Sequence, residues 1–319
     1  MVSRPPGPAA PELPDAAAAA ARLAVWEAGL DPAQPDRSGI RVLAYGEISA
    51  TMVLPDPLFT GVVAKRMTGF PDHAAAVDYV DLVTSYCRDL RAAGVAVVDT
   101  SAVPVPRPGR APAVYLLQPQ LPADGLGNTL LRTADDDALT ELIAAVLAQV
   151  DATRTAGDAA AEMAIDAQLS NWWLAADAGA APALLDVGTP FVRRAGRYLM
   201  APRILLAAVP PGVRSWYLWR RTGEHYMDDY FDRRLLALDL LGNFIKEGAP
   251  ERLGVGLAAV NDWLGVEGPV TRAQVLEYYE QDAATLELFL RVRRADRWLR
   301  TRVLRRDYDF VLPGQVRRR

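Results

Sequence analysis

The chain has 319 residues, of which 51% are hydrophobic and 23% are charged, a globular composition with room for one large domain or two lobes. Its formal net charge of −4 provides no overall field that would attract nucleic acid or an anionic membrane. The sequence contains no run of eighteen apolar residues, and prolines interrupt its start, so we expect a soluble, cytoplasmic protein with no nucleic-acid or membrane partner.

The first part of the chain predicts mainly strands. Residues 1–14 are rich in Pro and Ala, which is typical of a disordered leader, and Asp15 can then cap a helix. Between the last two strands, four prolines at positions 104, 106, 108 and 112 predict a stiff loop. The expected elements are a helix over 16–27, strands over 41–49, 50–54 and 61–67, a helix over 72–93, and strands over 95–98 and 113–118.

The remainder of the chain predicts mainly helices, over 136–153, 227–247, 258–264 and 271–302. The fold class is therefore α+β, with a small β-rich N-terminal lobe over 15–120 and a larger α-helical C-terminal lobe over 121–319. Clefts between two lobes are favoured places for ligand binding.

Lys65 is notable because it is one of only two lysines, whereas the chain has 33 arginines. It lies at the end of an apolar strand, where a compact ammonium can act as a point charge against phosphate oxygens. The alternative interpretation is a strand lysine that extends its charged head into solvent.

An acid and an amide occur close together in the second half of the chain. Asn171 follows Asp166 by five residues. Asp186-Val187-Gly188 closes the apolar segment 183–185 and lies fifteen residues after Asn171, a distance that allows a hairpin to bring Asn171 and Asp186 to one metal ion. One carboxylate can orient a hydroxyl group, while an amide oxygen and a second carboxylate can hold Mg²⁺. The order of these residues therefore indicates a site for a magnesium–nucleotide complex.

In this order the motifs resemble the protein-kinase-like superfamily, in its small-molecule branch of aminoglycoside and choline kinase type. The resemblance covers about residues 40–190. Val63-Ala64-Lys65 resembles the strand with the phosphate-binding lysine, and Gln118–Leu121 resembles the linker between the lobes. The segment from Asp166 to Asn171 resembles the catalytic loop, and Asp186-Val187-Gly188 resembles the metal-binding segment.

The resemblance implies a two-lobed kinase-like fold and an ATP- and Mg²⁺-dependent phosphotransferase that acts on a hydroxyl of a small molecule. It implies that Lys65 holds the α and β phosphates, positioned by Asp81 or Asp78, and that Asp166 orients or deprotonates the acceptor. Asn171 and Asp186 would ligate magnesium. The remaining implied nucleotide contacts are Gly46 and Ser49 in the phosphate loop, and Gln118, Gln120 and Leu121 in the linker.

Two departures from the family pattern support an alternative. Ala164 stands where the family usually has His, and Gly46 is nearly the sole glycine of its loop. These features favour a catalytically impaired, pseudokinase-like binding or regulatory protein. A third possibility is transfer of a different part of the nucleotide, such as AMP.

Two charged regions allow more than one interpretation. The acids at positions 224, 228, 229 and 232 form either a solvated face or a docking surface for a cationic acceptor. From Arg291 to the end there are eleven Arg and three Asp, which predict either a solvated helix with a frayed tail or a surface that binds phosphate or a partner.

Overall fold

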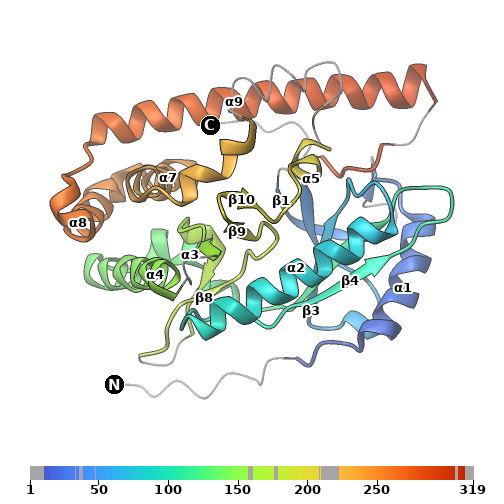
Figure 1. Cartoon of the computed structure of the whole chain (residues 1–319), viewed down its shortest axis with the longest axis horizontal. Coiled ribbons are helices and arrows are strands. Elements are labelled where there is room, and N and C mark those ends of the chain that lie inside the picture. The colour runs from blue at the N-terminus through green and yellow to red at the C-terminus, as the bar shows by residue number, and fades with distance from the viewer. Residues whose placement is uncertain are drawn as a thin grey trace.

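One antiparallel sheet organises the N-terminal part, with its strands in the order β1–β2–β3–β5–β4 (Figure 1). The computed structural model describes residues 11–32, 34–35, 39–46, 48–156, 161–175, 179–207, 209, 223–305 and 308–312. The strands are β1 (Arg41–Tyr45), β2 (Ser49–Val53), β3 (Val62–Met67), β4 (Ser101–Val105) and β5 (Ala113–Pro119).

The two faces of this sheet are covered by different helices. Because side chains alternate along a strand, Tyr115 and Leu117 of β5 pack in the cluster that contains α1 (Ala16–Gly29). Val114 and Leu116 point the other way and pack with α2 (His73–Ala92). The same alternation places the side chains of Lys65 and Arg66 on opposite faces of β3. Because Arg66 pairs with Glu27 of α1, Lys65 lies on the side of α2.

The C-terminal part is mainly helical. Its helices are α3 (Gly127–Thr133), α4 (Asp136–Ala156), α5 (Pro202–Leu206), α7 (Arg233–Lys246), α8 (Leu253–Leu264) and α9 (Arg272–Trp298). Helix α8 contacts α4 and α7, and α9 contacts α7. One hydrophobic cluster includes residues of α2, α4, α7 and α8, so the two parts of the chain share a core.

Short elements connect these helices. Two small sheets are formed by β6 (Ala161–Ala164), β9 (Phe191–Arg194) and β10 (Arg197–Tyr198), and by β7 (Trp172–Trp173) and β8 (Ala183–Leu184). The 3₁₀ turns are η2 (Pro57–Phe59), η3 (Ala123–Gly125), η4 (Leu169–Asn171), η6 (Gly223–Tyr230), η7 (Pro250–Arg252) and η8 (Gly265–Glu267). A π-helical turn, η9 (Leu299–Val303), continues α9.

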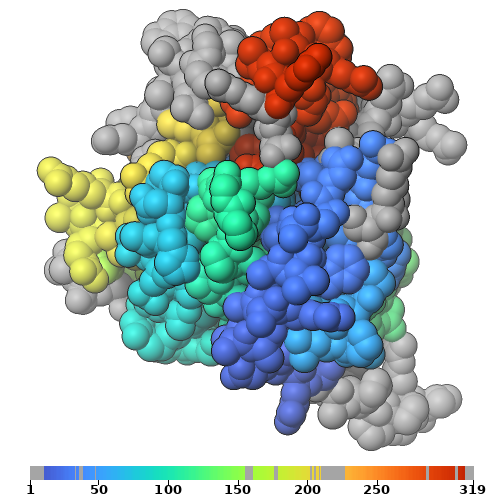
Figure 2. Space-filling model, turned by 90° about the vertical axis from the view of Figure 1, so that its right-hand side faces the viewer, coloured from blue at the N-terminus to red at the C-terminus, as the bar shows by residue number. Residues whose placement is uncertain are grey.

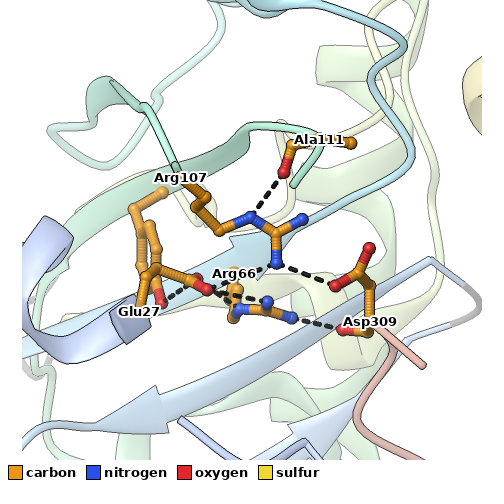
Figure 3. A network of polar contacts seen from close by, with 6 residues as sticks. Glu27, Arg66, Arg107, Ala111 and Asp309 are labelled. Atoms are coloured by element: carbon orange, nitrogen blue, oxygen red, sulfur yellow. Dashed lines mark hydrogen bonds and ion pairs between the residues drawn. The ribbon is translucent and has the colours of Figure 1, made fainter. Parts of the chain in front are cut away.

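A buried ionic network connects α1 to the face of the sheet that it covers (Figure 3). Glu27 accepts hydrogen bonds from Arg66 at 2.5 and 3.0 Å and from the Tyr115 hydroxyl at 2.6 Å. Burial raises the pKa of Glu27, but the charge and hydrogen bonds of Arg66 outweigh it and hold this pKa below its ordinary value. The carboxylate is therefore ionised and fully used in structure.

The same network fastens the C-terminal segment 308–312 to the sheet. Arg66 donates to the backbone oxygen of Asp309 at 2.6 Å, and Arg107 pairs with the Asp309 carboxylate at 2.9 Å. Figure 1 shows α9 running above the other elements, from the side of α7 and α8 to the side of the sheet. Helix α9 and segment 308–312 together therefore link the helical part to the sheet.

The predicted α+β class and the division into a β-rich and a helical part are confirmed. The predicted strand at 95–98 is wrong, because only Val97 forms an isolated bridge there, to Leu184. The fourth strand is instead β4, which contains Pro104 within the expected loop. An edge strand tolerates proline because one of its sides needs no ladder hydrogen bonds.

Two other expectations concern the N-terminal leader and the absence of a membrane-spanning helix. The leader expected over 1–14 lies outside the described residues for its first ten positions. Among the residues that the structure describes, no helix is long and apolar enough to cross a membrane.

Candidate functional site

Lys65 and Asp186 form an ion pair across the two parts of the chain. The distance from the Lys65 Nζ to the Asp186 Oδ1 is 2.6 Å, and the side chains are 19% and 37% exposed. The Gly188 N–H also donates to Asp186 Oδ1, at 2.9 Å. Burial raises the pKa of Asp186, but the Lys65 charge and these hydrogen bonds outweigh it, so the pKa lies below its ordinary value.

Gly188 leaves room beside this ion pair. A Cβ at this position would lie 3.2 Å from Lys65 Nζ and 3.3 Å from Asp186 Oδ1. A larger residue would therefore require the ion pair to shift by a few tenths of an ångström.

A hairpin brings Asn171 beside Asp186. Strands β7 and β8 pair so that Trp172 is opposite Leu184, and the Leu185 N–H donates to the Asn171 carbonyl at 2.8 Å. This confirms the predicted hairpin between the two segments. Carboxylate and amide oxygens suit Mg²⁺, which usually keeps several waters and takes further ligands from substrate phosphates. The oxygen donors of Asn171 and Asp186 are of the types that Mg²⁺ takes, but the described residues contain no group of three His, Cys, Asp or Glu that could hold a metal.

Asp166 lies in the loop before η4, held at several points. Its Oδ1 accepts the Gln168 N–H at 2.8 Å, and its backbone oxygen accepts the Trp172 indole N–H at 3.1 Å. Burial, followed by the negative charge of Asp239 and then that of Asp186, raises the pKa of Asp166 to about 8. A carboxyl group that titrates near neutral pH is suited to general acid–base work.

Gln168 and Asp239 lie next to Asp166, and no motif in the sequence marks either residue. The Gln168 side-chain amide donates to Asp239 Oδ2 at 2.7 Å. Burial raises the pKa of Asp239 to about 6, against the hydrogen bond from Gln168. Asp239 lies inside the helix predicted over 227–247 and belongs to no motif, so only the fold brings it to the loop.

The expectation that Asp81 or Asp78 positions Lys65 is wrong for this structure. Both acids are exposed on α2, whereas Tyr79 is buried and donates to the Gly188 carbonyl at 2.7 Å. Neighbouring helix positions point about 100° apart, so burial of Tyr79 turns both acids away. One face of α2 therefore reaches the segment 186–188 through a hydroxyl rather than a carboxylate.

A second tyrosine on the same face supports the segment that leads to Asp166. The Tyr86 hydroxyl donates to the Ala164 carbonyl at 2.6 Å, two residues before Asp166. Burial raises the pKa of Tyr79 and of Tyr86 well above the ordinary value, so both hydroxyls stay protonated donors. The backbone at Ala164, two residues before Asp166, is thus anchored from α2.

Tyr79→Phe is expected to lower the free energy of unfolding by about 1–2 kcal/mol, because it leaves the buried Gly188 carbonyl without its donor. In a chain of this length the melting temperature should fall by about 2–3 °C. Thermal unfolding measures this. Tyr45→Phe, at an exposed position of β1, is the matched control. Equal melting temperatures for the two variants would contradict a stabilising bond to Gly188.

The predicted phosphate loop is a tight turn between β1 and β2. The Gly46 N–H donates to the Ser49 carbonyl at 2.9 Å, and a Cβ on Gly46 would lie 2.6 Å from Ser49 Oγ. The intervening Glu47 lies outside the described residues. The turn therefore brings Gly46 and Ser49 together, with the Gly46 amide already bonded.

The three predicted linker residues, Gln118, Gln120 and Leu121, differ in their contacts. Gln118 directs its side-chain amide to the Leu185 carbonyl at 2.7 Å, next to Asp186. The Gln120 N–H donates to the Gly61 carbonyl at 2.7 Å, so it is engaged within the protein rather than available to a base. Leu121 follows it, partly exposed, before η3.

Comparison with known proteins gives a family but no activity. Residues 31–297 match the model of a family described as "Family of unknown function (DUF6206)". A search of curated proteins found no match.

Proposed function

The chain belongs to this DUF6206 family, and from its site we propose that it is an ATP- and Mg²⁺-dependent phosphotransferase of kinase-like fold that acts on a hydroxyl of a small molecule. The observation that carries the proposal is the ion pair of Lys65 with Asp186, two residues 121 positions apart in the chain. The Lys65 ammonium matches the anionic phosphates of a magnesium–triphosphate complex, and the Asp186 carboxylate matches its metal cation.

Nucleotide binding would separate the two members of this pair. At 2.6 Å, Lys65 and Asp186 leave no space for a phosphate between them. The Lys65 ammonium would bind phosphate oxygens, while Asp186 and the neighbouring Asn171 would hold the metal. When bound, magnesium would neutralise the charge that develops on the phosphates.

Asp166 would act on the acceptor. Its carboxylate form can accept the proton of an attacking hydroxyl, and the neighbouring charges would keep its affinity for a proton high enough to do so near neutral pH. The proton would move from the acceptor oxygen to an Asp166 carboxylate oxygen as phosphoryl transfer proceeds.

A cationic acceptor is favoured by the acids around Asp166. Asp239 is the largest charged contributor to the raised pKa of Asp166, and a cation bound there would relieve this repulsion. The stretch from 224 to 232 offers less. Asp228 pairs with Arg193 at 3.4 Å, and Asp232 caps α7. The acceptor is therefore better sought beside Asp239 than on that stretch.

Ligand-dependent stability and turnover test the proposal together. An enzyme of this kind should melt at a higher temperature with ATP plus Mg²⁺ than with either alone, by about 2.7 kcal/mol of stabilisation at a ligand concentration 100 times Kd. Product formation should depend on both. Absence of any shift at millimolar ATP and Mg²⁺ would contradict nucleotide binding.

The same experiment separates the binding-only alternative, which Ala164 favours. A pseudokinase-like protein would show the shift in melting temperature without turnover when candidate hydroxyl and amine-bearing acceptors are supplied. The mass of the modified acceptor distinguishes a phosphoryl group from an AMP group, since the additions are about 80 and about 329 mass units.

A further inference from the structure

The end of α9 exposes large apolar side chains over a short stretch. Figure 2 shows this end, in red, standing out at the top of the molecule. We call residues 296–305 the α9 end face. Its apolar members, with their exposed fractions, are Trp298 (62%), Leu299 (43%), Val303 (54%) and Leu304 (50%). Soluble proteins expose single apolar residues freely, but four large ones within seven consecutive residues favour an interaction surface.

The α9 end face is also strongly cationic. Residues 296–305 contain four arginines, at positions 297, 300, 302 and 305, and one acid, Asp296, in a chain whose net charge is −4. Asp296 is paired with Arg300 at 2.9 Å. Arg302 and Arg305 are both exposed, and neither forms an ion pair with another described residue. The positive charge is thus available beside the apolar side chains.

We propose that the α9 end face docks the protein on an anionic membrane surface. An anionic bilayer offers lipid phosphates to arginines and an apolar layer to Trp and Leu side chains a few ångströms deeper. The partner would be peripheral, because the described helices do not cross a bilayer. This inference is independent of the proposed phosphotransferase activity, and it departs from the expectation drawn from the net charge of the whole chain.

Other occupants satisfy only one property of this face. A second copy would bring Arg302 and Arg305 toward the same arginines and would repel them. Nucleic acid would match the charge, but aliphatic side chains such as Leu299 and Val303 gain little from a phosphate backbone. A lipid surface satisfies the charge and the apolar side chains together.

Vesicle sedimentation with the full chain tests the proposal. The protein should bind vesicles made of equal amounts of phosphatidylcholine and phosphatidylglycerol, should bind pure phosphatidylcholine vesicles much less, and should dissociate as salt is raised. Combining Arg302→Gln with Arg305→Gln should lower the affinity about 25-fold, since each arginine near an anionic leaflet contributes about fivefold. Trp298→Ala should lower it about tenfold through lost apolar burial.

Matched controls use exposed positions elsewhere. Arg272→Gln, at the opposite end of α9, and Val266→Ala should leave vesicle binding unchanged, with all variants melting within about 1 °C of the parent. Equal binding to both vesicle types, or equal loss in Arg272→Gln, would overturn the proposal. So would a dimer in solution that Trp298→Ala converts to a monomer, or tight binding to heparin with none to vesicles.

Discussion

Asp186→Asn is expected to reduce ATP turnover by about 10³-fold or more, because it removes the carboxylate that would hold the metal while keeping the size of the side chain. The part of the ATP-induced rise in melting temperature that needs Mg²⁺ should disappear, since Asn171 alone offers only a neutral oxygen. Turnover and melting curves with ATP, with and without Mg²⁺, measure both effects.

The same substitution changes how stability depends on pH. The pKa of Asp186 is depressed in the folded protein, so its contribution to stability is present above the unfolded pKa, near 4, and is lost as pH falls through the folded value. Asp186→Asn should therefore be less stable than the parent at neutral pH, with the difference shrinking in acid. A difference that grows toward acid would contradict the ion pair with Lys65.

Asp81→Asn provides the comparison that separates the structure from the sequence-based expectation. The Asp81 carboxylate is exposed and does not meet Lys65, so turnover should stay within about twofold of the parent. A loss as large as that of Asp186→Asn would mean that α2 turns its acid toward Lys65 when nucleotide binds.

The phase of α2 is where prediction from the sequence met its limit. Apolar spacing predicted the existence and length of this helix, and the structure adds that Asp72, expected as its first residue, is its N-cap. Val80 and Tyr79 are both compatible with an apolar face, yet choosing one or the other rotates the helix by about 100°. Tyr79 is buried in the hydrophobic core and donates to Gly188, which is 109 residues away and invisible in a local pattern.

Long-range polar contacts were equally inaccessible. Lys65 and the hairpin from Asn171 to Asp186 were predictable because rare residue types and an apolar strand mark them. Glu27 and Arg66, 39 positions apart, look like ordinary surface charges in sequence, although both are buried in the structure. Charged residues are rarely buried unless paired, and pairing is a property of the fold rather than of the segment.

Asp166→Asn is expected to abolish the proposed turnover, by about 10²–10⁴-fold, and at the same time to stabilise the protein at alkaline pH. The pKa of Asp166 is raised to about 8, whereas the unfolded value is near 4. Between these values the folded protein binds a proton that the unfolded chain does not, so the stability contributed by this group is fully present below pH 4 and is lost as pH rises toward 8.

An asparagine does not ionise and escapes this loss. At pH 8–9 the variant should be more stable than the parent by about 2 kcal/mol, which corresponds to about 3 °C in melting temperature. This difference is smaller than the full pKa shift implies, because the Asp166 carboxyl is partly exposed. Near pH 4 the two should melt together. Asp262→Asn, at an exposed position of α8, should show no such trend. A variant less stable than the parent at pH 9 would show that the Asp166 carboxylate contributes to the stability of the fold. A more stable variant is the result expected of a carboxylate whose charge is kept for function at a cost in stability.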